Sequence, residues 1–84
     1  MRNDVIVIIE ICVIKREWIC AFDCEKLIVE NIKNFLELIY KDIQYEYLYS
    51  ENLIIVDKYS NTLINPFVHS TNSYLYNGIT LQLY

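Results

Sequence analysis

The sequence contains a single glycine among its 84 residues. This scarcity excludes a glycine-rich phosphate-binding loop, because such a loop needs several glycines to bring backbone N–H groups close to the phosphate. Its one histidine, His69, could act with a cysteine nucleophile only if one of the three cysteines lay beside it. We expect His69 to be a polar residue of a connecting segment, and we expect a protein without enzymatic activity.

Basic residues are also few. Seven Lys and Arg residues stand against eleven Asp and Glu residues, which gives a net charge of −4 and an isoelectric point near 4.8. Binding to nucleic acid requires clustered Lys and Arg side chains, and no basic run occurs in this sequence. We therefore expect no nucleic-acid partner.

No apolar run is long enough to cross a membrane. The longest, "VIVIIEICVI" at residues 5–14, is interrupted by Glu10, and a membrane helix needs about 20 apolar residues. Asp4 and Glu10 also break the pattern of a signal peptide, and no small-residue cleavage site follows. These features predict a soluble, cytoplasmic protein with no direct insertion into a membrane.

The three cysteines, Cys12, Cys20 and Cys24, form no obvious disulfide framework. An odd number without a secretion signal favours reduced thiols. One disulfide stays geometrically possible if Cys12 and Cys20 face each other across a hairpin. Together with His69 they could supply four zinc ligands, but their spacings lack the closely paired cysteines of zinc motifs. We expect no metal and no cofactor.

The chain is long enough for one domain, and we expect residues 1–84 to form it. Hydrophobic residues make up 55% of the sequence and charged residues 21%, with a mean hydropathy of +0.22. The hydrophobic fraction is higher than the roughly 45–50% that is usual for a soluble domain, and the moderate charged fraction with a single Gly argues against disorder.

Two strands and a short turn are predicted at the start of the chain. Residues 4–13 are rich in Val and Ile, and residues 17–23 alternate apolar and polar side chains. A two-residue turn, which we favour, would place Trp18, Cys20 and Phe22 on the same face as the odd-numbered apolar residues from Val5 to Val13. A three-residue turn would reverse the face of the second strand.

Residues 25–43 have the periodicity of an amphipathic helix. One stripe carries apolar residues at helical spacing, namely Ile28, Ile32, Phe35, Leu36, Ile39 and Ile43. The opposite side alternates in charge and is predicted to form an ion-pair ladder of Lys26, Glu30, Lys33, Glu37 and Lys41. Asp23 is expected to cap the start of the helix, and Glu25 to lie near its positive end.

The second half of the chain is expected to supply short strands and a crossover. Residues 44–52 are ambiguous between loop and edge strand, whereas 53–58 and 62–64 are predicted strands. Residues 67–76 should form turns or a short helix after Asn65-Pro66. An Asn77-Gly78 turn then precedes an alternating strand that runs to the last residue.

These elements predict an α+β domain of two layers. A helix with one apolar face needs a sheet to cover it. The nearly continuous apolar residues of the first strand favour a central position, with the last strand beside it in parallel. The expected architecture is a β-grasp, a mixed sheet of four or five strands with one amphipathic helix packed across it.

The sequence resembles the ubiquitin-like superfamily in its helix stretch "ENIK" at 30–33 and its ending "YNGITLQLY" at 76–84. More narrowly, it resembles the small YukD/EsaB-type proteins of Gram-positive type VII secretion loci. The matching segments are the helix at "IKNFLELI", the strand "LIIVDK", "TLI" at 62–64 and "NGITLQL".

The resemblance implies a ubiquitin-like fold and a role as an accessory or regulatory component of a type VII-like secretion system. Ubiquitin and the sulfur carriers act through a flexible Gly-Gly tail. In this sequence the last residues are Gln82, Leu83 and Tyr84, which we expect to lie in the sheet. We therefore expect a protein that is not conjugated.

The remaining candidate for function is a surface. The other face of the first strand carries Ile6, Ile8, Cys12 and Ile14. We expect Tyr45, Tyr47 and Tyr49 to contribute to this surface, with Gln82 and Tyr84 at its flank. Scattered exposed aliphatic residues are normal, and residues 44–52 could also fold over them. A contiguous patch of this kind nevertheless marks binding sites, and tyrosine is enriched at interfaces.

We therefore predict a non-catalytic protein-interaction module. Its partner would be a larger protein, such as a membrane-bound secretion component, or a second copy in a homodimer. The alternative is a small carrier or thiol-dependent domain, either a sulfur carrier or a redox protein. Fast alkylation of a thiol at neutral pH would favour that alternative.

Overall fold

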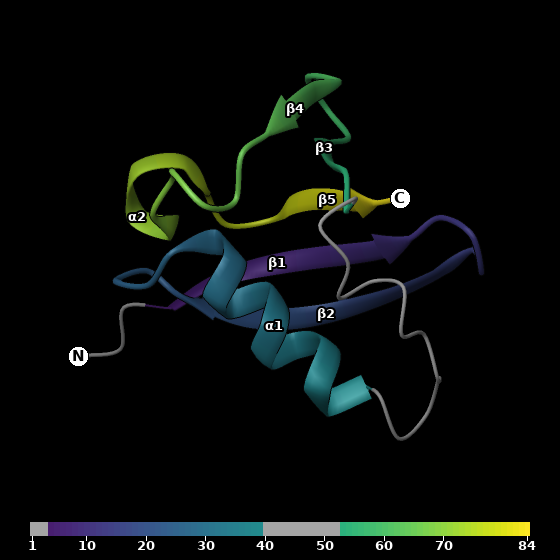
Figure 1. Cartoon of the computed structure of the whole chain (residues 1–84), viewed down its shortest axis with the longest axis horizontal. Coiled ribbons are helices and arrows are strands. Elements are labelled where there is room, and N and C mark those ends of the chain that lie inside the picture. Colours follow the sequence, from purple (N-terminus) through teal and green to yellow (C-terminus); the bar gives the residue numbers. More distant parts are fainter. Residues whose placement is uncertain (1–3, 40–52) are drawn as a thin grey trace.

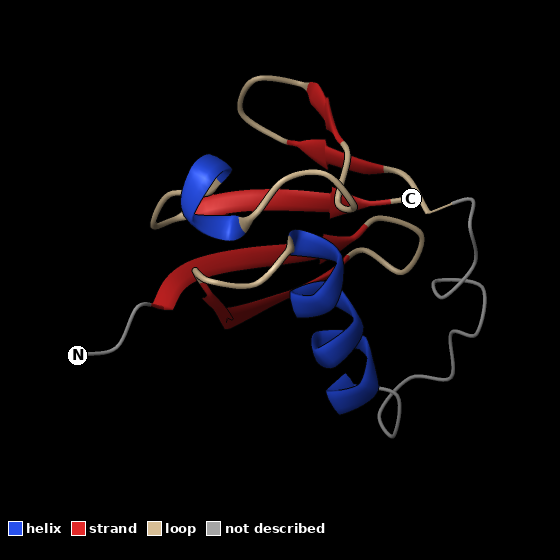
Figure 2. Ribbon diagram, turned by 60° about the vertical axis from the view of Figure 1, so that its left-hand side comes forward, coloured by secondary structure: helices blue, strands red, loops and turns tan. Residues whose placement is uncertain are grey.

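A computed structural model of the chain describes residues 4–39 and 53–84. The elements in these ranges are β1 (Asp4–Ile11), β2 (Arg16–Asp23), α1 (Ile28–Ile39), β3 (Ile55–Asp57), β4 (Thr62–Ile64), α2 (Thr71–Tyr74) and β5 (Ile79–Leu83). The strands form one mixed sheet in the order β2-β1-β5-β3-β4, and α1 lies against one side of it (Figures 1 and 2). The predicted α+β class and mixed sheet are confirmed.

The strand β1 occupies an interior position in the sheet, as its apolar sequence predicts. It pairs antiparallel with β2 and parallel with β5, so that Ile9 lies beside Leu81. The odd-numbered side chains of β1 and β5 are buried on the side that α1 covers. The predicted parallel pairing of the first and last strands is confirmed.

The register of the first hairpin places the expected side chains together. Val7 lies opposite Cys20 and Ile9 opposite Trp18, so the prediction for the second strand's buried face is confirmed. The turn is longer than predicted, because pairing ends at Ile11 and Arg16 and leaves residues 12–15 to reverse the chain. The predicted turn of two residues and the observed turn of residues 12–15 both contain an even number of residues. The side chains of β2 therefore point to the same face of the sheet in either case.

The same register excludes the disulfide between Cys12 and Cys20 that the sequence left possible. Cys20 pairs with Val7 and so does not face Cys12 across the hairpin. All three cysteines are free thiols in the structure, and each is half-buried. The possibility of a Cys12–Cys20 bond is therefore not realised.

The helix α1 buries the predicted stripe. Its buried residues are Ile28, Asn31, Ile32, Phe35, Leu36 and Ile39, whereas the predicted Ile43 lies outside the described residues. Lys26, Glu30, Lys33 and Glu37 are exposed as expected, but within residues 4–39 no ion pair joins them. Long exposed side chains gain little from pairing and lose rotamer freedom by it, so the ladder is a solvated face. Lys41 lies outside the described residues.

The start of α1 differs from the prediction. The helix begins at Ile28, and the Asp23 carboxylate accepts a hydrogen bond from the Glu25 N–H at 2.9 Å in the turn before it. The N–H groups of Ile28 and Val29 donate instead to the carbonyls of His69 and Pro66, at 3.1 and 2.9 Å. The crossover segment therefore caps the helix with backbone carbonyls, which the sequence did not reveal.

Asn31 is a polar residue on the buried stripe of α1, and its side chain is fully engaged. Its Oδ1 accepts from the Asp23 N–H at 2.8 Å, and its Nδ2 donates to the carbonyls of Asp23 and Leu27, both at 3.1 Å, and to Thr71 Oγ1 at 2.9 Å. One amide thus joins the end of β2, the helix and α2.

The end of the chain lies within the sheet. Gly78 has φ of +88°, and its N–H donates to the Ile6 carbonyl at 2.8 Å, while Asn77 Oδ1 accepts from the Ile6 N–H at 2.9 Å. These bonds fix where β5 begins beside β1. Beyond β5, Tyr84 and Ile54 exchange backbone hydrogen bonds of 2.9 and 3.3 Å. The prediction that pairing continues to the last residue is confirmed.

Candidate functional site

The sheet has a second face, turned away from α1, which we call the outer face. Side chains alternate along each strand, so this face is formed by the residues that the core does not take. They are Ile6, Ile8 and Glu10 in β1; Glu17, Ile19 and Ala21 in β2; Thr80, Gln82 and the adjoining Tyr84; Val56 with the flanking Ile54 and Lys58; and Leu63 in β4.

One apolar area of the outer face lies on β1 and β2. Ile8 stands between Ile19 on one neighbouring strand and Thr80 on the other, and Ile6 lies beside Ala21. Ile19 is 78% exposed and Ile6 is exposed as well, whereas Ile8 is half-buried between its neighbours. Such directly paired side chains form a contiguous surface.

A second apolar area lies at the other side of the sheet. Val56 pairs with Leu63, which is 71% exposed, and Ile54 pairs with Tyr84. The two areas are separated by the strand β5, whose outward residues Thr80 and Gln82 are polar.

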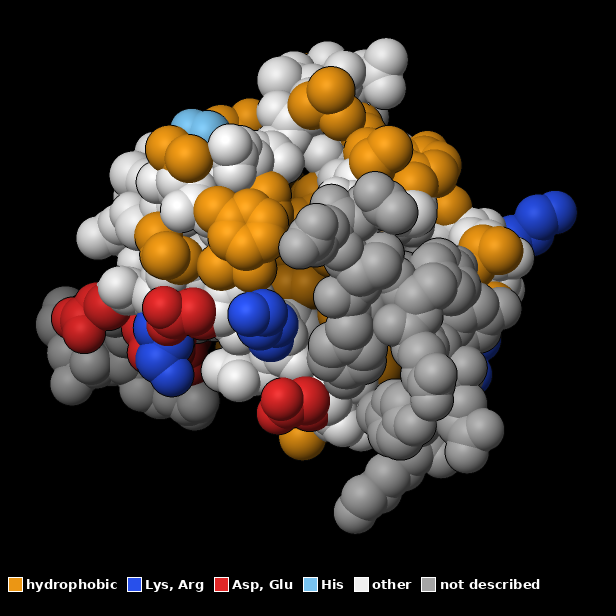
Figure 3. Space-filling model, in the orientation of Figure 1, with side chains coloured by type: hydrophobic (Ala, Val, Ile, Leu, Met, Phe, Trp, Pro, Cys, Tyr) orange, Lys and Arg blue, Asp and Glu red, His pale blue; other side chains and the backbone are white. Residues whose placement is uncertain are grey.

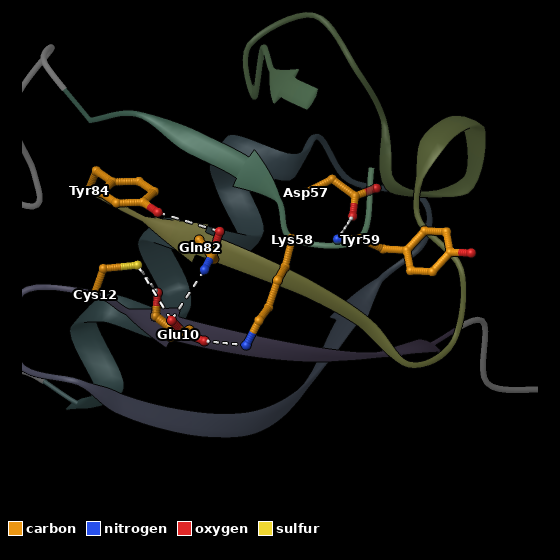
Figure 4. A network of polar contacts seen from close by, with 7 residues as sticks. All are labelled: Glu10, Cys12, Asp57, Lys58, Tyr59, Gln82 and Tyr84. Carbon is orange, nitrogen blue, oxygen red and sulfur yellow. Dashed lines mark hydrogen bonds and ion pairs between the residues drawn. The ribbon is translucent and has the colours of Figure 1, made fainter. Parts of the chain in front are cut away.

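A polar cluster lies between these areas (Figure 4). Lys58 Nζ is 3.1 Å from Glu10 Oε2, and Gln82 Nε2 donates to Glu10 Oε1 at 3.3 Å. The Cys12 thiol lies 3.7 Å from Glu10 Oε1, and the Tyr84 hydroxyl is 3.5 Å from Gln82 Oε1. In Figure 4 these side chains lie in front of the sheet, with α1 behind it.

The ion pair sets the charge of the cluster. The hydrogen bond from Lys58 lowers the pKa of Glu10 below its ordinary value, and the same bond raises the pKa of Lys58. Glu10, whose side chain is 19% exposed, is therefore held ionised at neutral pH. A general acid needs a pKa near the working pH, so the cluster has the character of a fixed ion pair.

The structure brings most of the predicted surface residues together. Ile6, Ile8, Gln82 and Tyr84 lie on the outer face, and the half-buried Cys12 adjoins it through Glu10. Tyr45, Tyr47 and Tyr49 lie outside the described residues.

The prediction for Ile14 is wrong. Ile14 lies in the turn, not in the first strand, and it packs against the hydrophobic core. Lys15 follows it in the left-handed region, with φ of +54°, and its N–H donates to the Cys12 carbonyl. Because the chain reverses direction here, the alternation of inward and outward side chains along β1 stops before Ile14.

Sequence reasoning missed the four other large aliphatic residues of the outer face, Ile19, Ile54, Val56 and Leu63. The signal for Ile19 was present, because in a half-buried strand it alternates with Trp18 and Cys20. The other three required the sheet order, which brings β3 and β4 beside β5. The outer face is therefore more apolar than the sequence alone indicates.

The other surface features give weaker support for a functional site than the outer face does. Exposed hydrophobic side chains gather around His69 over the crossover on the helix side (Figure 3), with Phe67, Val68 and Tyr76 exposed there. The His69 and Tyr74 rings pack with their centroids 4.9 Å apart. In residues 4–39 and 53–84, no three His, Cys, Asp or Glu side chains are grouped as a metal site would require.

Comparison with protein-family models, curated proteins and solved structures found no match to this chain. In the described part of the protein, neither helix has the length and apolar character needed to cross a bilayer.

Proposed function

We propose that this protein is a non-catalytic protein-interaction module that binds its partner through the outer face. The observation that carries the proposal is the paired apolar surface of Ile6, Ile8 and Ile19. Side chains in water gain about 25 cal/mol for each Å² of apolar area that a partner buries. The Glu10–Lys58 pair at the border of this surface adds fixed polar groups that orient a partner.

We further propose that the fold is a ubiquitin-like β-grasp spanning the whole chain. The support is the strand order β2-β1-β5-β3-β4, the parallel pairing of β1 with β5, and the position of the helix α1 between β2 and β3 in the chain. The resemblance to YukD/EsaB-type proteins then favours an accessory or regulatory component of a type VII-like secretion system. It would act in the cytoplasm, with a protein such as a membrane-bound secretion component as its partner.

Replacing both Ile6 and Ile8 by lysine is expected to abolish capture of the partner. Affinity capture from an extract of the source organism, quantified by mass spectrometry, should lose the partner with Ile6→Lys/Ile8→Lys and retain it with Val68→Lys. Val68 is as exposed as an outer-face residue but lies on the crossover. Two lysines in a desolvated apolar contact cost several kcal/mol, enough to reduce affinity by about 1,000-fold.

Circular dichroism separates loss of binding from loss of folding. The double variant should keep the helix signal of the wild type, because Ile6 is exposed and the lysine at position 8 can extend to water. Equal capture of the same protein by wild type and folded double variant would contradict the proposal.

The thiols test the alternative of a carrier or redox protein. Cys20 Sγ lies 3.4 Å from the Val7 carbonyl, and burial raises the pKa of Cys20 to about 11. Burial also raises the pKa of Cys12. Thiolate is the reactive form, and two pKa units above an ordinary thiol reduce its fraction about 100-fold at neutral pH.

Cys20 is therefore expected to react with iodoacetamide at pH 7.5 about 100-fold more slowly than a free thiol. Peptide mapping of timed alkylation reactions measures this rate, and the same reaction in denaturant supplies the control. A native rate for Cys20 or Cys12 above that of the denatured chain would favour the thiol-dependent alternative.

A further inference from the structure

The strand β2 forms one edge of the sheet, and within residues 4–39 and 53–84 the outward backbone groups of Glu17, Ile19 and Ala21 have no hydrogen-bond partner. The Ile6 N–H and carbonyl bond toward β5, so the neighbouring Val7 turns its own groups toward Cys20 on β2. Backbone groups alternate in direction along a strand. Those of Glu17, Ile19 and Ala21 therefore point away from the sheet, and their side chains are exposed.

In the part of the chain that the structure describes, this edge lacks several of the usual protections. It spans eight residues without a proline or a break in register, and only Arg16 contributes a basic side chain. Natural edge strands are commonly short, charged, bulged or covered, because an open edge pairs with another strand. At its far end the edge is closed, since the Asn31 side chain bonds both the N–H and the carbonyl of Asp23.

The helix layer beside this edge is also incompletely covered. A hollow of about 420 Å³ separates β2 from α1 and is lined in part by Cys20, Ala21, Phe35 and Leu38. Leu38 is 78% exposed although it borders this hollow. Apolar side chains thus flank the open edge on both sides of the sheet, Ile19 on the outer face and Leu38 on the helix side.

We propose that two copies of this chain associate through β2, antiparallel, around a two-fold axis at Ile19. In this register Ile19 faces Ile19 of the second copy, and Glu17 faces Ala21. A shift one way would require the N–H and carbonyl of Asp23, which Asn31 holds. A shift the other way would require Lys15, whose φ of +54° lies outside the strand conformation. Only the register centred on Ile19 therefore pairs the outward N–H and carbonyl groups of Glu17, Ile19 and Ala21.

The charges at the ends of β2 suit this arrangement. Lys15 and Arg16 stand at its start, and Asp23 stands at its end. Antiparallel pairing brings the basic start of each copy beside the acidic end of the other, which favours association. We call the interface between the two β2 strands the β2 seam. The two-fold axis also places both α1 helices on the same side of the joined sheet, so that each Leu38 lies next to this seam. Isologous contacts of this kind form closed dimers.

This inference goes beyond the proposed function and does not depend on it. The seam uses the edge of the sheet and leaves Ile6 and Ile8 on the outer face open to a partner. A monomeric protein could still bind through that face, and a dimer could form without it.

Replacing Ala21 by proline tests the seam. Proline removes the Ala21 N–H, which the chain's own ladder does not use, and its ring obstructs the edge. Ala21→Ser retains the N–H and is the matched control. Sedimentation should give wild type and Ala21→Ser twice the monomer mass of 10.1 kDa, whereas Ala21→Pro should stay monomeric, with a dimer dissociation constant raised at least about 100-fold.

Amide hydrogen exchange identifies the surface. In the wild type, the amides of Glu17, Ile19 and Ala21 should exchange more slowly as protein concentration rises, because pairing protects them. If Ala21→Pro fails to fold by circular dichroism, Ile19→Asp replaces it and sets two carboxylates opposite each other at the axis.

A wild-type protein that stays monomeric up to about 500 μM overturns the proposal. So does a dimer in which these three amides exchange as fast as in the monomer, since its contact would lie elsewhere. Failure of this test leaves partner capture by the outer face unaffected.

Discussion

Leu81→Ala is expected to lower the free energy of unfolding by about 3–5 kcal/mol. Leu81 is completely buried in β5, with Ile9 beside it on β1 and Asp57 on β3. Truncation removes apolar contacts from the middle of the sheet and leaves a cavity in the hydrophobic core. A domain of this size is stabilised by about 5–10 kcal/mol, so the variant should retain a small fraction of its stability.

Leu63→Ala is the matched control, because the same side chain is 71% exposed on β4. Its effect should be below about 0.5 kcal/mol. Urea denaturation followed by circular dichroism measures both variants. Similar midpoints for the two would show that β5 does not lie inside the core.

Asn31→Ala is expected to cost about 2–3 kcal/mol of the free energy of unfolding. The substitution leaves the Asp23 N–H without its acceptor and removes the contact with Thr71, which joins α1 to α2. The loss exceeds that of an ordinary hydrogen bond because the amide is buried and serves several partners at once.

The control for this prediction lies one turn further along the same helix. Asn34→Ala makes the same chemical change at an exposed position, and alanine is the better helix former there. It should be neutral or slightly stabilising in the same denaturation experiment. A loss of stability at position 34 equal to that at 31 would refute the role of Asn31 as a junction.

Much of the fold could be predicted because it depends on local periodicity. The alternation in β1 and β5 and the stripe from Ile28 to Ile39 each identify a buried face from neighbouring residues alone. The buried face of β2 could be predicted because it depends only on whether the turn has an even or odd number of residues. The predicted turn was too short, but the predicted and observed turns both have an even number of residues, so the predicted face is correct.

The features that escaped prediction depend on residues distant in sequence. Pro66 and His69 cap a helix that begins nearly forty residues earlier in the chain, so no local signal reveals them. Asn31 stands at a core position of the helical stripe, and its partner Thr71 lies in another element. Leu63 joins the outer face only through the order of the strands.

Dimerisation through the β2 seam would enlarge the outer-face surface that is offered to a partner. In the proposed dimer both outer faces lie on the same side of one continuous sheet, with Ile19 of each copy at the axis. The apolar areas of the two copies would then adjoin and present about twice the surface to a partner. A partner with two matching sites would gain affinity from this arrangement without any new contact.

Isoleucine methyl spectra test the central claim most directly, because this chain carries isoleucines on both sides of its sheet. The spectra are recorded on the protein alone and with the partner that the wild type captures. Binding through the outer face predicts that shifts and broadening concentrate on Ile6, Ile8, Ile19 and Ile54, while the buried Ile9, Ile28, Ile32 and Ile79 stay nearly unchanged. Changes confined to the buried isoleucines and the helix, with the outer-face methyls unmoved, would contradict the account.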